Sequence, residues 1–138
     1  MARVNDPGEI SKALAEARTI AVVGLSPDAS RPSNSIARYL IREGYEVIPV
    51  NPGFETVLDR RSYPDLLSIP AGVAIDIVDV FRRSEFVAAV ADEAIARKVG
   101  FVWLQDGVVD RESARRLNEA GIPVAMDRCI YRDREARR

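Results

Sequence analysis

The most constraining feature of the sequence is an apolar run near its amino-terminal end. The run, TIAVVG at positions 19–24, is rich in β-branched residues and shows no alternation of apolar and polar side chains. This pattern is typical of a parallel strand that is covered on both faces, since a strand with one wet face would alternate. Helices must then lie on both sides of the sheet to which the strand belongs. The run therefore predicts an α/β fold.

Strand-like and helix-like segments alternate along the rest of the chain. Further strands are predicted at 46–50, 75–80, 101–104 and 122–126. Helices are predicted from Pro7 to Ala17, from Ser33 or Ser35 to Gly44, and over 84–98 and 110–119, with an irregular crossover at 54–74 and a polar tail at 131–138. Right-handed crossovers between successive strands then build a doubly wound, five-stranded parallel sheet in three layers, which is a Rossmann-like fold.

The expected strand order is 3-2-1-4-5. In such a sheet the ligand crevice lies outside the carboxyl ends of the strands, where the loops after the first and fourth strands diverge. Pro49 removes one ladder donor from the second strand, which argues against a fully central position for that strand. Because a fold does not define a function, the functional prediction rests on the loops at these strand ends.

Composition narrows the classes of function. The 138 residues carry 20 Lys and Arg against 21 Asp and Glu, and 47% of them are hydrophobic. This length predicts one globular domain, residues 1–138, and the balanced charge offers no broad basic field for nucleic acid. No apolar run approaches the ~20 residues of a membrane span, so a cytoplasmic protein without a membrane partner is expected. Because the chain has no histidine, the commonest general base and metal ligand are missing, and neither catalytic residues nor a metal are predicted.

The loop after the first strand combines a glycine with hydroxyl and guanidinium groups. Gly24 would let the backbone approach a ligand closely, and the helix that follows offers unpaired N–H groups and the positive end of its dipole. Ser26, Arg31 and Ser33 add donors. Other residues stand where the dinucleotide fingerprint G-x-G-x-x-G needs glycines, so the loop predicts a phosphate cradle of another type. The alternative is a solvated loop that ends in a helix cap.

The second and third strands are followed by an amide and by guanidinium groups. Asn51, with Pro52 after it, can bond a ribose or base without repelling a ribose phosphate, as the acid of NAD-binding folds would. Its alternative role is that of a turn residue that ends the strand. Phe81, Arg82 and Arg83 follow the third strand, directly before a predicted helix. Cations at a helix start oppose the positive end of its dipole, and an anionic partner would offset this cost. The alternative is a pair of solvated arginines beside a core phenylalanine.

The last two strand ends are more ambiguous. Gln105 is a neutral group that could bind an amide-bearing ligand, while Asp106 and Gly107 form a strong turn pair. Cys129 follows the fifth strand and could be a reactive thiolate beside Arg128, although no histidine can serve as its base. A lone cysteine is more often a small buried hydrophobe.

Taken together, these segments resemble the small stand-alone CoA-binding proteins, which are similar to the CoA-binding domain of the succinyl-CoA synthetase alpha subunit. The resemblance covers nearly the whole chain and rests on AVVGLS at 21–26, RPS at 31–33, VIPVNP at 47–52, IDIVDVFRRS at 75–84, WLQ and GV within 103–108, and MDRC at 126–129. The chain departs from the pattern at Asn34, where a ring-bearing residue is expected, and at Asp106, which places a charge near the ligand path. The synthetase reaction also needs a phosphorylatable histidine, which this sequence lacks.

The resemblance implies a protein that binds CoA or an acyl-CoA without catalysis of its own. It implies a phosphate near the first loop, the adenosine end between Asn51 and the turn at Phe81 and Arg82, and the pantetheine arm at Gln105. The predicted ligand contacts are Gly24, Ser26, Arg31, Ser33, Asn51, Pro52, Phe81, Arg82, Gln105 and Gly107.

Three alternatives stay open at the level of the sequence. The first is an enzyme that binds NAD(P) or another nucleotide, which the missing glycines and acid disfavour. The second is a redox regulator in which Cys129 forms a mixed disulfide with CoA. The third is a protein with a vestigial crevice that works through a partner, such as a separate ligase subunit. A homodimer is also left open.

Overall fold

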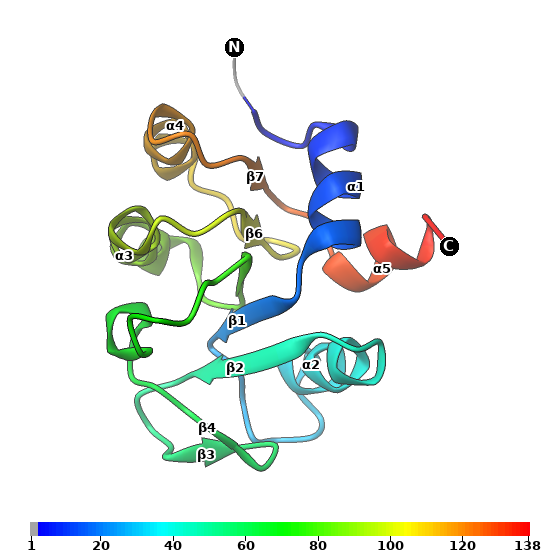
Figure 1. Ribbon diagram of the computed structural model, residues 1–138, viewed down its shortest axis with the longest axis vertical. Coiled ribbons are helices and arrows are strands. Elements are labelled where there is room, and N and C mark those ends of the chain that lie inside the picture. Colours follow the sequence, from blue (N-terminus) through cyan, green and yellow to red (C-terminus); the bar gives the residue numbers. More distant parts are fainter. Residues whose placement is uncertain (1–2) are drawn as a thin grey trace.

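A computed structural model describes residues 3–138 of the protein. Its main sheet consists of β1 (Thr19–Val23), β2 (Glu46–Val50), β5 (Ile77–Val80), β6 (Val102–Leu104) and β7 (Val124–Ala125) (Figure 1). These five strands lie in the order β2-β1-β5-β6-β7, and every neighbouring pair is parallel. The predicted Rossmann-like α/β fold with a five-stranded parallel sheet is therefore confirmed.

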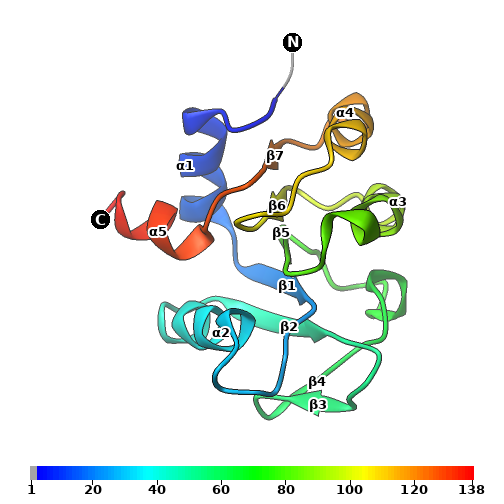
Figure 2. The same ribbon diagram turned by 180° about the vertical axis from the view of Figure 1, so that it is seen from behind.

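The strand order differs from the predicted 3-2-1-4-5, because in chain order the five strands lie 2-1-3-4-5. β5 lies between β1 and β6, as Figure 2 shows, and all four of its residues are buried. β2 instead lies at the edge, where Pro49 needs no partner for a second ladder. On the free side of β2, the Tyr63 N–H donates to the Pro49 carbonyl oxygen over 3.1 Å. The topological switch point therefore lies between β1 and β5, and not at the fourth strand.

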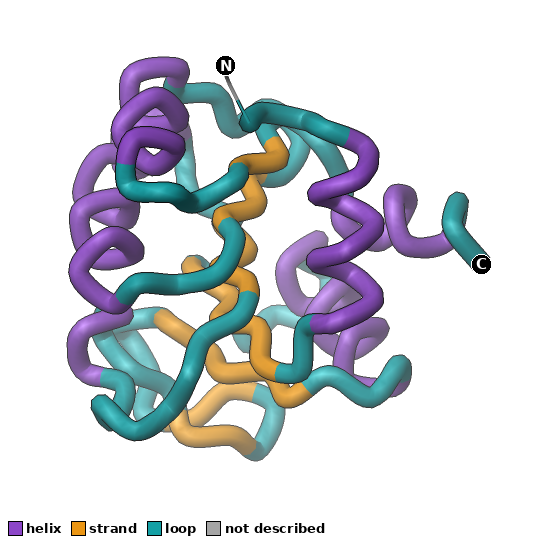
Figure 3. Tube along the Cα trace, turned by 45° about the horizontal axis from the view of Figure 1, so that its top comes forward, coloured by secondary structure: helices purple, strands orange, loops and turns teal. Residues whose placement is uncertain are grey.

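Helices cover both faces of this sheet (Figure 3). The helices α1 (Pro7–Glu16), α2 (Pro32–Arg42) and α5 (Ile130–Glu135) lie on one face. The opposite face carries α3 (Val87–Arg97), α4 (Arg111–Glu119) and the short turn η1 (Leu66–Ser68). Alternate residues of β1 enter two apolar clusters, Ile20 and Val22 on the first face and Ala21 and Val23 on the second. This double burial explains why the run at 19–24 shows no polar alternation.

The carboxyl-terminal residues correct a second prediction. Residues 130–135 form α5, not part of a polar tail, and α5 packs against α2. Ile130 is fully buried, and the Arg134 guanidinium donates to the Tyr39 and Tyr45 hydroxyls and to the Glu43 carboxylate. The buried Ile130 and Asp133 and a set of distant partners therefore stabilise a helix whose own sequence is almost entirely polar.

The crossover between β2 and β5 contains more structure than expected. It forms an antiparallel hairpin of β3 (Thr56–Val57) and β4 (Arg60–Arg61), followed by η1. A second short turn, η2 (Ser84–Phe86), precedes α3. Within residues 3–138, no helix has the length and apolar character that crossing a membrane would require.

Candidate functional site

A crevice of about 580 Å³ lies at the carboxyl ends of the strands. Its walls come from the loops that follow β1, β5, β6 and β7, together with the starts of α2 and α5. Eight of the ten predicted contact residues line it, namely Gly24, Ser26, Arg31, Ser33, Phe81, Arg82, Gln105 and Gly107. The other two, Asn51 and Pro52, border a separate hollow of about 590 Å³ beside the β3–β4 hairpin. Most of the predicted residues are thus brought together, although they come from distant parts of the chain.

The sheet itself requires a glycine at the end of β1. Gly24 has a φ of +86°, and a Cβ at this position would lie 2.9 Å from the Phe81 carbonyl oxygen. The loops after β1 and β5 therefore meet at the switch point, where the crevice opens. The contact with Phe81 gives this glycine a structural role in the sheet, and close approach to a ligand at Gly24 stays a prediction.

The side chains of Ser33 and Asn34 hold the first loop against α2 by hydrogen bonds to Ser26. The Ser33 hydroxyl does not cap α2; it accepts a hydrogen bond from the Ser26 N–H over 3.0 Å. Asn34, which is buried, donates to the Ser26 carbonyl oxygen over 2.9 Å. The N-cap residue is Arg31, whose side chain makes no capping hydrogen bond, and Pro32 is the first helical residue. The start of α2 therefore faces the crevice without a side-chain cap.

Guanidinium groups line the crevice on the side of β1 and β5. The Arg82 guanidinium lies 4.3 Å from the centre of the Phe86 ring, and that of Arg83 lies 5.3 Å from the same ring. Arg83 also forms an exposed ion pair with Glu85 at 3.6 Å. Within residues 3–138, Arg82 has no carboxylate partner. The helix predicted over 84–98 begins as η2 and continues as α3 from Val87, and the Ser84 hydroxyl accepts from the Val109 N–H at 2.9 Å.

Gln105 supplies a buried amide at the end of β6. Its side chain lines the crevice and the residue is only 4% exposed. The Oε1 atom accepts a hydrogen bond from the Ile130 N–H over 3.1 Å. No acceptor among residues 3–138 takes a hydrogen bond from Nε2. Since Nε2 is accessible from the crevice and has no acceptor among residues 3–138, a ligand carbonyl in the crevice can accept its hydrogen bond.

Beyond Gln105, the crevice ends in a turn and an ion pair. The Gly107 N–H donates to the Asp127 carboxylate over 2.7 Å, which ties the β6 loop to the β7 loop. Asp106 forms two hydrogen bonds with Arg132 of α5, and both residues line the crevice. Cys129 lines the same part and is buried. Sequence reasoning missed Arg132, since nothing in the polar segment 131–138 signalled a helix that would bring it there.

The Asn51 amide bonds two backbone groups of the protein. Its Nδ2 donates to the Leu25 carbonyl oxygen over 3.1 Å, and its Oδ1 accepts from the Gly53 N–H over 2.9 Å. These bonds tie the loop after β2 to the loop after β1. They correspond to the turn role that the sequence left as an alternative.

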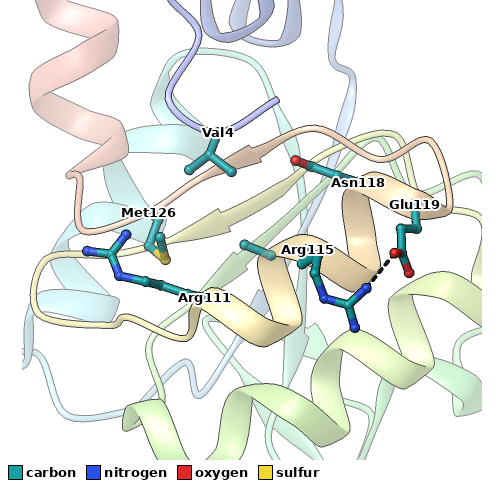
Figure 4. Close-up of a pocket in the computed structure, with 7 residues that line it drawn as sticks. Val4, Arg111, Arg115, Asn118, Glu119 and Met126 are labelled. Carbon is teal, nitrogen blue, oxygen red and sulfur yellow. Dashed lines mark hydrogen bonds and ion pairs between the residues drawn. The ribbon is translucent and has the colours of Figure 1, made fainter. Parts of the chain in front are cut away.

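Another hollow of comparable size lies beside the edge strand β7, between residue 4 and α4 (Figure 4). It has a volume of about 500 Å³ and an apolar floor that includes Val4 and Met126. Apart from Arg111, its charged and amide side chains have partners within residues 3–138. The Arg115 guanidinium pairs with Glu112 and Glu119, and the Asn118 amide bonds the backbone of Arg3. The crevice, with its unpartnered donors, is therefore the stronger candidate site.

These features define the class of protein: a Rossmann-like α/β fold with a ligand crevice at the carboxyl ends of its parallel strands. Residues 18–135 match the family model described as "CoA binding domain", and the chain belongs to this family. The family predicted from the strand-end motifs is thereby confirmed.

Relatives of this chain include both short and long proteins. The uncharacterized protein YneT of Bacillus subtilis is 40% identical over 122 residues, which are 88% of this chain and 89% of YneT. The structure of a hypothetical protein from Pyrococcus horikoshii OT3 is 35% identical, with a TM-score of 0.90 over 95% of this chain and 91% of that chain. The acetate–CoA ligase (ADP-forming) II of Archaeoglobus fulgidus is 30% identical over 108 residues, 74% of this chain but 16% of the ligase. The similarity to the ligase therefore concerns one segment of a much longer protein.

Proposed function

We propose that residues 1–138 act as one domain that binds CoA or an acyl-CoA in the crevice and performs no catalysis of its own. The observation that carries the proposal is the buried Gln105 amide, whose Nε2 finds no acceptor within residues 3–138. CoA joins phosphate groups to a tail that contains amide groups, so a carbonyl of the tail can accept from this donor. Its phosphates match the guanidinium groups of Arg31 and Arg82 at the other side of the crevice. Membership of the CoA binding domain family supports the same ligand.

The proposed orientation follows the order of the strands. The pyrophosphate lies near Ser26, Ser33 and the uncapped start of α2, where a helix N-terminus favours an anion. The adenosine end points toward β2, where Asn51 and Pro52 border the second hollow. Since the Asn51 amide is bound to Leu25 and Gly53, this residue contributes by shaping the loop on which adenosine rests.

Thermal unfolding of the purified protein with and without ligands tests the proposal. A ligand that binds only the folded state at about 100 times its Kd adds roughly 2.7 kcal/mol to the free energy of unfolding, which raises Tm by several degrees. CoA and acetyl-CoA are expected to raise Tm more than NAD or ADP at equal concentration. A larger effect of NAD would favour the nucleotide enzyme, and no effect of any ligand would contradict the proposal. If Cys129→Ala abolished the effect of CoA, a thiol-dependent mode would replace it.

A substitution of Arg82 tests whether this arginine contacts the ribose phosphate of CoA. Arg82→Ala is expected to weaken the binding of CoA by about 1.5–3 kcal/mol, because a charge-assisted hydrogen bond to a phosphate is lost. The same substitution should weaken the binding of dephospho-CoA much less, because this ligand lacks the ribose phosphate. Arg111→Ala removes an exposed arginine outside the crevice and serves as the matched control. Equal weakening of both ligands by Arg82→Ala would show that Arg82 does not contact the phosphate that dephospho-CoA lacks.

A further inference from the structure

The charged groups of the crevice are unevenly distributed along the edge of the sheet. Arg31 follows β1, and Arg82 and Arg83 follow β5, whereas Asp106 follows β6 and Arg132 lies in α5. β5 separates β1 from β6, so the ends of these two strands are about 10 Å apart. The crevice therefore has a cationic half on the side of β1 and β5. In its other half, on the side of β6 and α5, the two charges cancel.

The pair between Asp106 and Arg132 is bidentate. Nη1 of Arg132 donates to Oδ2 of Asp106 over 2.8 Å, and Nη2 donates to Oδ1 over 2.7 Å. The hydrogen bond from Arg132 lowers the pKa of the Asp106 carboxyl, which is therefore ionised at neutral pH. Both terminal nitrogens of Arg132 are engaged by this one carboxylate. The pair joins the β6 loop to α5 at the margin of the crevice, next to Gln105.

We infer that this pair makes the site selective for CoA species with an uncharged tail, meaning the free thiol or a short uncharged acyl group. The inference rests on the proposed function, because the cationic half must hold the phosphates and so direct the tail toward β6. A tail that ends in a carboxylate then meets the like charge of Asp106. Asp106 already takes two of the five N–H donors of Arg132, so this tail must compete with Asp106 for the guanidinium. An uncharged tail meets neither obstacle.

Calorimetric titration with two matched ligands tests the selectivity. Butyryl-CoA and succinyl-CoA carry acyl groups of the same carbon number, and only the second ends in a carboxylate. The wild-type protein is expected to bind succinyl-CoA about two- to fivefold more weakly than butyryl-CoA, the range for interactions between exposed charges. The difference should shrink at high salt, which screens such charges.

Two variants should change the ratio of the Kd for succinyl-CoA to the Kd for butyryl-CoA in opposite directions. Asp106→Asn removes the like charge and frees Arg132, so succinyl-CoA should become the tighter ligand. Arg132→Gln leaves Asp106 uncompensated and should disfavour succinyl-CoA more strongly than in the wild type. Asp92→Asn, the matched control, breaks an ion pair with Arg116 outside the crevice and should leave the ratio unchanged. Because both ligands are compared on the same folded variant, an effect on stability cancels in the ratio.

The outcomes separate this inference from the proposed function. Equal ratios in the wild type and in Asp106→Asn, with CoA still bound, would overturn the selectivity and leave the proposed function standing. A wild-type protein that binds both acyl ligands equally well would have the same consequence. Failure of CoA, butyryl-CoA and succinyl-CoA to bind at all would overturn the proposed function and the selectivity together.

Discussion

Gly24 lies where β1 ends and where the backbone of β5 passes beside it. Its φ of +86° belongs to the left-handed region, and a Cβ would lie 2.9 Å from the Phe81 carbonyl oxygen. Gly44, at the end of α2, has a φ of +99° but no atom within 4 Å of a Cβ. The two glycines therefore separate the effect of backbone conformation from that of steric contact.

Gly24→Ala is expected to destabilise the protein more than Gly44→Ala. The left-handed conformation alone costs about 1–2 kcal/mol for an alanine at either position. At Gly24 the strand backbone must also shift, since the contact is with Phe81 main-chain atoms. Urea unfolding of the two variants without ligand measures the difference. Equal losses would mean that the β1–β5 junction accommodates a side chain.

Asp79 is the most unusual residue of the sheet. It lies in the centre of β5, is fully buried, and neither carboxylate oxygen has a partner among residues 3–138. Burial raises the pKa of this carboxyl well above its ordinary value of about 3.9. The folded protein therefore holds a proton at pH values where the unfolded chain has released it.

The protonated Asp79 should make stability fall as pH rises. Between the unfolded and the folded pKa the folded state binds one more proton, so this group lowers the free energy of unfolding by about 1.4 kcal/mol per pH unit. Asp79→Asn mimics the protonated form and removes this pH dependence. The free energy of unfolding of the variant should therefore rise relative to that of the wild type as pH rises through that window. Urea unfolding at several pH values above 4 measures the two curves. Parallel curves would mean that Asp79 has an ordinary pKa in the folded state.

At the level of the element, α5 shows how a short polar helix is stabilised. A six-residue helix is unstable by itself in water, because nucleation is unfavourable. Contacts to α2 and to the residues just after it compensate: Arg134 reaches Tyr39, Tyr45 and Glu43, and Glu135 accepts from the Tyr39 hydroxyl. The helix also carries Arg132 to the margin of the crevice.

Arg134→Ala is expected to loosen α5 selectively. Charge-assisted hydrogen bonds contribute about 1.5–3 kcal/mol each, so hydrogen exchange of the amides at 130–136 should accelerate by about tenfold or more. Arg115→Ala removes a more exposed arginine, with a side chain 55% exposed against 22% for Arg134, and serves as the control. Exchange of the strand amides should stay slow in both variants. Unchanged protection of 130–136 would show that the hydrogen bonds of Arg134 are not needed to hold the helix.

At the scale of the whole molecule, the parallel sheet gathers residues that are far apart in sequence. All five strands end at one edge, so loops from positions 24 to 132 meet in a single crevice. The switch point between β1 and β5 places the uncapped start of α2 beside Arg82. The same arrangement places Gln105, two strands away from β1, in a different part of the crevice from Arg82.

The sequence by itself determined the α/β class, the parallel sheet, and most of the crevice-lining residues. Apolar runs and helical periodicity are local signals, and parallel strands always end at the same edge. The tertiary structure alone decided that β2 is the edge strand, that 130–135 is a helix, and that Asp106 meets Arg132. It also decided that the Asn51 amide is bound within the protein. Strand order and side-chain partners depend on contacts between residues far apart in the chain, and no local pattern encodes those contacts.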